Sequence, residues 1–199
     1  MSIHKIMNFE TKQAIKNALI IQIEEVGFER VTVKNLASTA NINRGTFYLH
    51  YKDKFEVMED LQQELISELE SYVKNVQPLE AFQMLKTGQF YPPFVEVIKC
   101  FKEHATAFRV ILGEQGSPGF SKRLKEVFSN QILDRLSVIG EELQDPEFRQ
   151  YLQAFLASAI LGIIQEWLDR GNEELSVEEL ANIHFRLLRF LGNLTSMQS

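Results

Sequence analysis

Residues 32–51, TVKNLASTANINRGTFYLHY, contain the pattern that decides the fold. Thr32 can cap a first short helix, because a threonine hydroxyl accepts a hydrogen bond from a backbone N–H of the first turn. The polar segment 41–43 favours a tight turn, and residues 44–50 have the length and composition of a second short helix. Two short helices joined by a tight turn form a helix-turn-helix, which is the motif that this stretch predicts.

Small and apolar side chains favour close packing of the two helices. Ala37 and Ala40 leave room for the helices to approach each other, and Ile42 supplies an apolar side chain in the turn. Phe47 and Tyr51 lie four residues apart, so they share one face of the second helix and can anchor it to a core. The opposite face is then free to contact a partner.

That opposite face carries the candidates for reading DNA bases, Arg44 and Thr46. They lie at the N-terminal end of the second helix, the end that meets base edges in the major groove. Arginine can donate two hydrogen bonds to O6 and N7 of guanine, and threonine can offer its hydroxyl or set its methyl against thymine. Gly45 removes a side chain where the backbone must approach phosphate. Candidates for phosphate contacts carry polar groups around the motif: Thr32, Lys34, Tyr48, His50, Lys52 and Lys54.

Charge is distributed unevenly along the chain. The whole sequence has a formal net charge of −6. Residues 1–55 hold eight basic and five acidic side chains, a net charge of +3, whereas the remainder carries −9. A basic N-terminal segment on an acidic body is the asymmetry expected when only that segment touches phosphate.

The rest of the chain also shows helical periodicity. A first helix is expected to begin at a Thr11 cap and to end at Gly27, where a left-handed residue commonly stops a helix. The expected later helices cover about 52–75, 79–87, 94–112, 120–143, 146–170 and 177–194. The fold class is therefore all-α, with a three-helix DNA-binding domain over residues 1–54 and a larger helical domain over residues 55–199.

Composition favours a cytoplasmic protein. One cysteine, Cys100, permits no internal disulfide, which suits a reducing compartment, and its thiol is expected to be buried and inert. The N-terminus lacks the apolar segment of a secretory signal. No stretch approaches the roughly 18 uninterrupted apolar residues of a membrane span.

No catalytic or metal-binding pattern emerges along the chain. With no strands expected, there is no strand-linked glycine-rich phosphate loop, and one cysteine with four scattered histidines lacks zinc-type spacing. We therefore expect no enzyme activity, no metal and no cofactor. One alternative is a helical protein-interaction module that uses the N-terminal domain as a docking surface and does not bind DNA. Another is an enzyme on a helical scaffold. The net charge of +3 on residues 1–55 and the presence of Arg44 disfavour the first alternative. The second lacks a set of catalytic residues.

The run GFERVTVKNLASTANINRGTFYLHYKDKFEVM, residues 27–58, resembles the DNA-binding domain of the tetracycline-repressor (TetR) family. The similarity covers about residues 10–60, and Arg44 and Leu49-His50 depart from the usual family residues, which leaves the operator sequence open. Residues 155–191 are similar to the last two helices of a TetR-family body. The resemblance implies a ligand-responsive, homodimeric repressor that binds a palindromic double-stranded operator and an unidentified small molecule. Whether it represses or activates transcription rests on the family alone.

The same resemblance directs attention to two sets of body residues. Apolar stripes on the last two helices are candidates for the dimer interface: Phe155, Ala159, Ile163, Ile183, Leu187 and Leu191. Mainly aromatic side chains are candidates for lining an effector pocket: Phe90, Phe94, Phe101, His104, Phe108 and Trp167. His104 is more often an ordinary satisfied histidine than a ligand, and most of the aromatic residues can equally be plain core.

Overall fold

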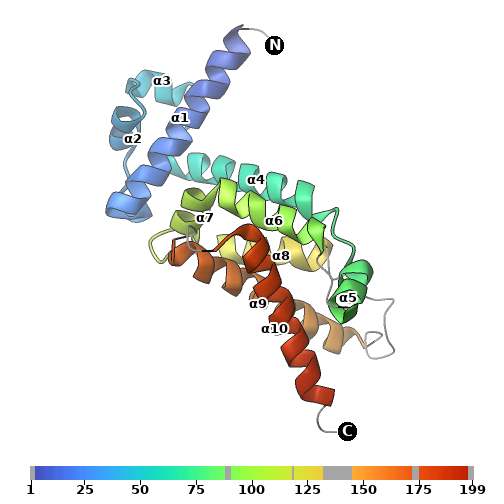
Figure 1. The fold of residues 1–199 in the computed structure, drawn as a ribbon. Coiled ribbons are helices and arrows are strands. Elements are labelled where there is room, and N and C mark those ends of the chain that lie inside the picture. The colour runs from blue at the N-terminus through green and yellow to red at the C-terminus, as the bar shows by residue number, and fades with distance from the viewer. Residues whose placement is uncertain (1–2, 88–90, 118, 132–144, 172–174, 197–199) are drawn as a thin grey trace. The chain divides into compact units, whose positions relative to one another are not determined.

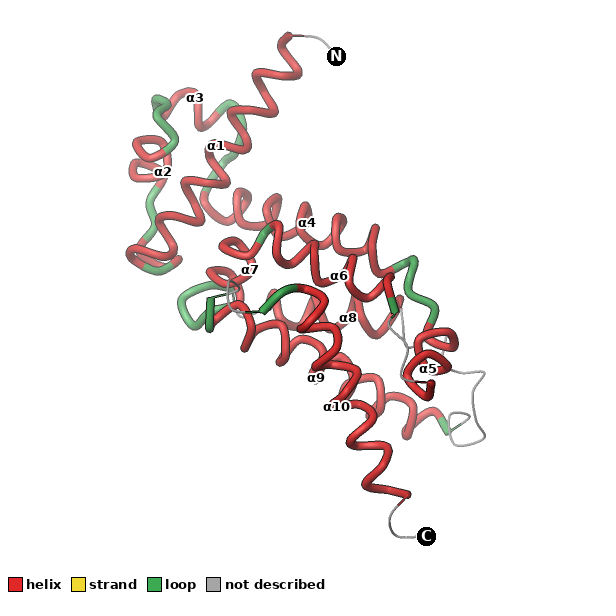
Figure 2. Tube along the Cα trace, viewed as in Figure 1, coloured by secondary structure: helices red, strands yellow, loops and turns green. Residues whose placement is uncertain are grey.

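The computed structural model describes residues 3–87, 91–117, 119–131, 145–171 and 175–196, and every regular element in these ranges is helical (Figures 1 and 2). The all-α prediction is confirmed. The head helices are α1 (Ile3–Val26), the short 3₁₀ turn Phe28–Arg30, α2 (Val33–Thr39), α3 (Arg44–Tyr48) and the first part of α4 (Lys54–Val73). The later helices are α5 (Pro78–Thr87), α6 (Pro92–Glu103), α7 (Ala105–Leu112), α8 (Phe120–Gln131), α9 (Pro146–Asp169) and α10 (Val177–Ser196).

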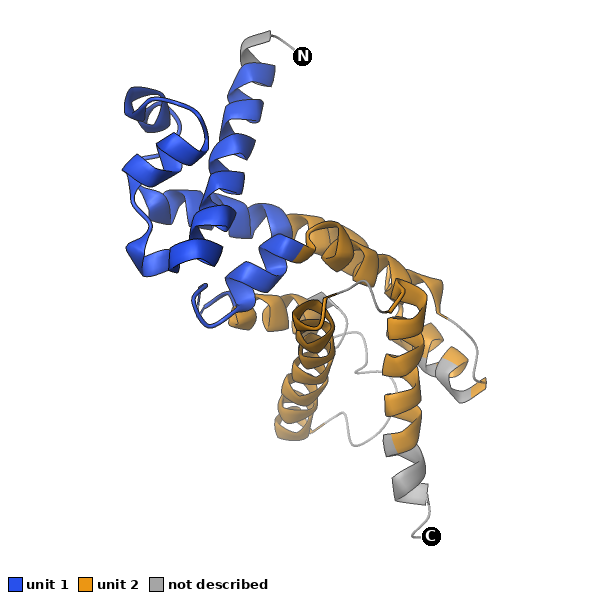
Figure 3. Cartoon of the chain, turned by 60° about the vertical axis from the view of Figure 1, so that its left-hand side comes forward, with its two compact units in different colours: residues 1–65, 106–120 blue, residues 66–105, 121–199 orange. Residues whose placement is uncertain are grey.

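The chain forms two compact units, coloured blue and orange in Figure 3. The head unit comprises residues 1–65 and 106–120, and the body unit comprises residues 66–105 and 121–199. Helix α4 therefore contributes to both units, and α7 belongs almost entirely to the head unit. The sequence placed the domain boundary at the start of α4.

Local capping explains several helix ends. The N–H of Gly27 (φ 78°) donates to the carbonyl of Ile23 at 2.8 Å, and the chain leaves α1 there. The hydroxyl of Thr32 accepts from the N–H of Asn35 at 3.2 Å and begins α2. Asp145 likewise caps α9 and accepts from the N–H of Glu147 at 2.9 Å. The predicted end at Gly27 and the predicted cap at Thr32 are confirmed.

A capping box precedes the last helix. The N–H of Glu179 donates to the hydroxyl of Ser176 at 3.2 Å, and the N–H of Ser176 donates to the Glu179 carboxylate at 2.8 Å. Both bonds satisfy N–H groups that have no partner within the helix. The bond from the Ser176 N–H also lowers the pKa of Glu179, because it stabilises the charged carboxylate.

Two helix predictions were wrong. Thr11 does not begin α1 but lies inside it, where its hydroxyl donates to the carbonyl of Met7 at 2.8 Å instead of capping. Residues 94–112 do not form one helix, because His104 leaves the helical conformation (φ −112°, ψ 27°) and separates α6 from α7. The expected helix 120–143 is seen as α8 to Gln131, and its remainder lies outside the described residues.

Each unit has its own apolar core. In the head unit, buried side chains come from α1, α2, α3, α4 and α7, among them Ile15, Leu19, Leu36, Phe47, Val57 and Phe108. In the body unit they include Leu69, Phe94, Phe101, Phe128, Ile164 and Leu168. Burial of such a side chain contributes about 1.5–3 kcal/mol, so packing of these faces, rather than helix propensity, holds the helices in place.

The loop after α7 holds the end of α1 in the head unit. The carbonyl of Gln115 accepts from the N–H of Phe28 at 3.1 Å, and the N–H of Ser117 donates to the carbonyl of Ile111 at 2.9 Å. Gly116 lies at the tightest point of this loop. A Cβ atom there would stand 2.1 Å from the carbonyl oxygen of Ile111.

Replacing Gly116 by alanine is therefore expected to lower the free energy of unfolding by about 1–3 kcal/mol, because backbone atoms must move to relieve the overlap. Urea denaturation followed by circular dichroism measures the loss. Gly119→Ala is the matched control, since a Cβ at Gly119 meets nothing within 4 Å. Equal stability of the two variants would contradict the expected role of the loop.

Candidate nucleic-acid interface

The turn between α2 and α3 is built from asparagines. Asn41 has φ 54°, and among the described residues it is the one non-glycine residue with a positive φ. Asparagine tolerates this left-handed conformation better than most residues. The next residue, Ile42, donates its N–H to the carbonyl of Ala37 at 2.9 Å, so the chain reverses directly after α2.

Asn43 caps the second helix of the motif. Its side-chain oxygen accepts from the N–H of Thr46 at 2.7 Å. A Cβ at Gly45 would lie 3.1 Å from that same oxygen, so glycine leaves room for the cap. Gly45 therefore has a structural role in the cap, in addition to the close approach to phosphate that was expected of it. The cap holds α3 by its N-terminal end, where the two candidate base-reading residues lie.

Arg44 and Thr46 lie where the sequence predicted them. Arg44 is exposed at the first position of α3, and one of its guanidinium nitrogens lies 3.5 Å from the Tyr48 hydroxyl. Thr46 is partly exposed, one residue beyond Gly45. Leu49 directly follows α3 and is 83% exposed, so an apolar side chain also stands free at this surface. Such exposed groups can meet base edges and thymine methyls.

The opposite side of α3 is anchored in the head core, as predicted. Phe47 is fully buried, and Tyr51 is almost fully buried with its ring centroid 6.2 Å from that of Phe47. The Tyr51 hydroxyl donates to the Asp60 carboxylate at 2.6 Å. Burial first, and then this bond, raise the pKa of Tyr51 far above its ordinary value, so the phenol keeps its proton.

Asp60 belongs to a charged network that the sequence did not reveal. Lys16, whose side chain is only 5% exposed, pairs with Glu64 and lies 3.5 Å from Asp60. Lys12 lies 3.5 Å from the same Asp60 oxygen. Burial opposes the charged carboxylate of Asp60, but the Tyr51 hydrogen bond and the two lysines outweigh it and lower its pKa. The network joins α1 to α4 on the side of Tyr51, away from the exposed face of α3.

The candidate phosphate-contacting residues fall into two groups. Thr32, Lys34, Tyr48 and Lys52 are exposed, as a phosphate contact requires. Lys54 is already engaged within the head unit. Its ammonium group donates to the carbonyls of Phe28 and Glu29 at 2.9 and 2.8 Å and lies 4.8 Å from the Phe28 ring centroid. Lys54 therefore links α4 to the turn after α1, and its phosphate contact stays a prediction.

His50 is half-buried after the end of α3. Its Nδ1 atom is buried and has no hydrogen-bond partner among the described residues. Burial, and then the charge of Lys12, lower the pKa of His50, so the imidazole is favoured in its neutral form. A neutral ring can donate a hydrogen bond to phosphate but adds no charge to the contact.

The described candidate pocket residues are divided between the two units. Phe94 and Phe101 are buried on α6, and Trp167 is buried on α9, where its indole N–H donates to the carbonyl of Leu175 at 3.2 Å. Phe108 is buried in the head unit, with its ring 6.1 Å from that of Phe120. His104 is half-buried at the end of α6, and Phe90 lies outside the described residues.

Sequence reasoning missed an aromatic cluster in the body unit. His184 on α10 is buried, stacks on Phe94 with a centroid separation of 4.6 Å, and stands beside Phe185. Burial lowers the pKa of His184 to about 4, so its ring is neutral. A signal was present, because His184 falls next to Ile183 on the apolar stripe of the last helix.

Helices α9 and α10 carry large apolar side chains that the single chain does not bury. Phe155 is 55% exposed and Leu187 is 45% exposed, while Ala159, Ile163 and Ile183 are partly buried. The side chain of Leu191 lies outside the described part of α10. Among the described helices, α9 is the one long and apolar enough to cross a membrane by length and composition, with one third of its most apolar window buried. Such a helix is weak support for a membrane span, because core and interface helices have the same composition.

Two family profiles match the chain. The profile described as "Bacterial regulatory proteins, tetR family" matches residues 15–61. The profile described as "Transcriptional regulator C-terminal region" matches residues 88–190, more than half of the sequence. The helix-turn-helix with its exposed N-terminal residues, in a chain whose described elements are all helical, is typical of a DNA-binding transcriptional regulator. The chain belongs to the TetR family, whose members are generally non-enzymatic DNA-binding proteins.

Individual relatives agree with this assignment. The chain is 26% identical over 156 residues to the uncharacterized HTH-type transcriptional regulator YxbF of Bacillus subtilis (strain 168). That alignment covers 78% of this chain and 39% of YxbF, so the chain spans about two fifths of the length of this curated relative.

Solved structures show the same fold. A TetR transcriptional regulator from Streptococcus agalactiae 2603V has a TM-score of 0.64 and 24% identity, over 93% of this chain and 97% of that one. The dihydroxyacetone kinase operon activator DhaS has a TM-score of 0.57 and 18% identity, over 91% of this chain and 95% of that one.

Proposed function

We propose that the chain is a homodimeric repressor that binds a palindromic operator and releases it when a small molecule binds. The observation that carries this proposal is the geometry of α3, which is capped by Asn43, anchored by Phe47 and exposed at Arg44 and Thr46. Two copies of such a helix, about 34–36 Å apart or a multiple of one DNA turn, meet successive major grooves on one face of the duplex.

Dimerisation through α9 and α10 is supported by their exposed apolar side chains. Phe148, Tyr151 and Phe155 stand out along α9, and Leu187 and Phe190 along α10. Apolar residues on two adjacent helices form the kind of surface that a two-fold symmetric partner covers with its own copy. The same contact accounts for the apolar character of α9 without a membrane.

Control by a small molecule follows from a difference in affinity between dimer arrangements. An effector that binds one spacing of the two heads better lowers operator affinity by that difference in binding free energy. The aromatic cluster of Phe94 on α6 with His184 and Phe185 on α10 supplies apolar surface for such a ligand. Because a repressor must reach chromosomal DNA, we propose that the protein is cytoplasmic.

Fluorescence anisotropy with the DNA upstream of its own gene tests operator binding. A specific complex that resists competitor DNA at moderate salt is expected, and only weak, strongly salt-sensitive binding would contradict it. A reporter gene behind the same DNA tests the direction of control. Expression should rise when the protein is removed, whereas a fall would make the protein an activator.

Replacing Arg44 by alanine is expected to weaken operator binding by about 1–3 kcal/mol and to relax the preference at one base position of each half-site. Anisotropy titrations against operators varied at single positions measure both effects. Arg30→Ala is a control of equal charge change, because Arg30 lies in the turn after α1 and its side chain bonds to the carbonyl of Val26. Uniform weakening across all operator variants would instead assign Arg44 to phosphate.

A further inference from the structure

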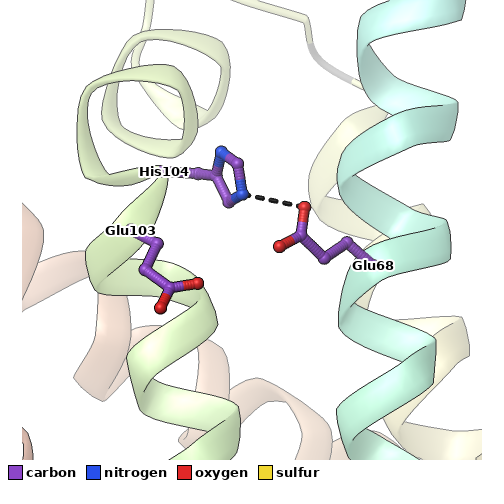
Figure 4. Close-up of side chains that lie close together, drawn as sticks. All are labelled: Glu68, Glu103 and His104. Carbon is purple, nitrogen blue, oxygen red and sulfur yellow. Dashed lines mark ion pairs between the residues drawn. The ribbon is translucent and has the colours of Figure 1, made fainter.

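Three potential metal ligands meet in the body unit where α6 ends beside α4. They are Glu68 on α4, Glu103 at the last position of α6, and His104 directly after it. One ligand atom from each residue lies within 4.8 Å of the other two. The Nε2 atom of His104 is 2.8 Å from a carboxylate oxygen of Glu68. Figure 4 shows His104 and Glu68 directed toward each other across the space between the two helices, with Glu103 beside them on the same segment as His104.

The break between α6 and α7 places the imidazole. His104 has left the helical conformation, while its N–H still donates to the carbonyl of Cys100 at 3.3 Å. In an uninterrupted helix, side chains at adjacent positions point about 100° apart. The break instead lets Glu103 and His104 converge on Glu68. The break between α6 and α7 therefore brings potential metal ligands together.

The basic group paired with the carboxylates of this cluster is the imidazole of His104. Among the described residues, no lysine or arginine forms an ion pair with Glu68 or Glu103. The nearby Lys99 pairs with Glu96 instead, at 2.7 Å. The charge of Glu103 is the first cause that raises the pKa of the Tyr72 phenol, and Glu68 and Glu96 add to it. The cluster therefore offers two carboxylates and an imidazole to a cation.

This donor set suits a divalent transition metal better than a hard cation. Imidazole nitrogen with carboxylate oxygen is a set that binds Zn²⁺, whereas Mg²⁺ and Ca²⁺ prefer oxygen alone. Zinc binds such atoms at about 2.0–2.2 Å, so the ligand atoms must come somewhat closer together than 4.8 Å. Glu103 is exposed, so its side chain is free to rotate. His104 and Glu68, hydrogen-bonded at 2.8 Å, would separate to about 3.3 Å to hold one tetrahedral ion.

We propose that Glu68, Glu103 and His104 bind one divalent transition metal ion of the zinc type. Three protein ligands leave a coordination position open to water or to an oxygen of a small molecule. The ion would tie α4 to the junction of α6 and α7, close in sequence to two of the three points where the chain passes between its two units. Spacing along the sequence could not reveal this set, because its members come from helices far apart in the chain.

Calorimetric titration of the chelator-treated, full-length protein with ZnCl₂ tests the proposal in the absence of DNA and effector. We expect one saturable site per chain, and binding at least ~10-fold weaker in His104→Gln and in Glu103→Gln. Glu80→Gln, which removes an exposed carboxylate of the same unit, should bind zinc as the wild type does. Circular dichroism of each metal-free variant verifies that it folds.

Cobalt substitution provides a second, independent readout. Co²⁺ bound through His104 is expected to give a visible absorption band that is lost in His104→Gln but kept in Glu80→Gln. Wild-type binding that both ligand variants leave unchanged would overturn the proposal. So would the absence of saturable zinc binding, or binding of Mg²⁺ as tight as that of Zn²⁺.

Discussion

Replacing Phe155 by glutamate is expected to convert the dimer into monomers and to weaken operator binding by about 100- to 10,000-fold. Phe155 is 55% exposed on α9 in the single chain, at the middle of the apolar surface proposed to meet a second copy. A charge placed there stays unpaired and desolvated in the dimer, yet remains hydrated in the monomer. Each head then binds its half-site alone and loses the gain from simultaneous binding.

Light scattering during size-exclusion chromatography measures the mass, and anisotropy with the full operator measures the affinity. Gln83→Glu is the matched control, because it adds the same charge at an exposed position of the same unit, outside the two helices of the proposed interface. It should stay dimeric and bind DNA normally. A Phe155→Glu protein that keeps both the mass and the affinity of the wild type would exclude this surface as the dimer interface.

The double substitution Asp60→Asn, Glu64→Gln is expected to lower the free energy of unfolding by about 3–5 kcal/mol. The side chain of Lys16 is 5% exposed, and Asp60 and Glu64 are its ion-pair partners. The amides keep the volume and hydrogen-bond acceptors but leave a buried ammonium group without an anion. Because the network lies behind Phe47 and Tyr51, operator affinity should fall as the head loosens.

Removing the lysine instead should cost far less. In Lys16→Met the buried charge is gone, and the two carboxylates, each more than one third exposed, remain hydrated. A loss of about 1 kcal/mol is expected, since partly exposed pairs contribute little. Urea denaturation of both variants measures this asymmetry. Equal losses would show that the network stabilises the head by packing rather than by charge.

The pH dependence of stability offers a second readout of the same network. The pKa of Asp60 is lower in the folded chain than its ordinary value, so the folded state binds its proton less readily than the unfolded chain. The stabilisation is therefore complete above the unfolded pKa, near 4, and is lost as pH falls through the folded pKa. The double amide variant should lose this contribution to acid unfolding.

Much of the head could be predicted because its signals are local. The Thr32 cap, the turn 41–43 and the anchors Phe47 and Tyr51 lie within one short stretch, and each depends on neighbours three or four residues away. The same holds for the Gly27 end of α1 and the capping box of α10. The exposure of Arg44 and Thr46, the candidate base-reading residues, was also predictable, because it follows once Phe47 is buried.

The break at His104 could not be predicted in this way. Apolar residues recur at helical spacing throughout residues 94–112, and this segment contains neither proline nor glycine. Local propensity therefore favours one helix. The prediction for Thr11 was wrong because its side chain has two possible roles. Its side chain can cap a helix or bond back to the preceding turn, and α1 extends far enough upstream to select the second.

By itself, the sequence determined the all-helical class, the helix-turn-helix and the residues that its second helix exposes, because helix period and capping are short-range properties. Only the tertiary structure decided which distant groups meet. It assigned α7 to the head unit, engaged Lys54 with the turn after α1, and surrounded Lys16 with two carboxylates. It also brought Glu68 to His104 across two helices. Such pairings depend on how helices pack, and no short-range pattern encodes them.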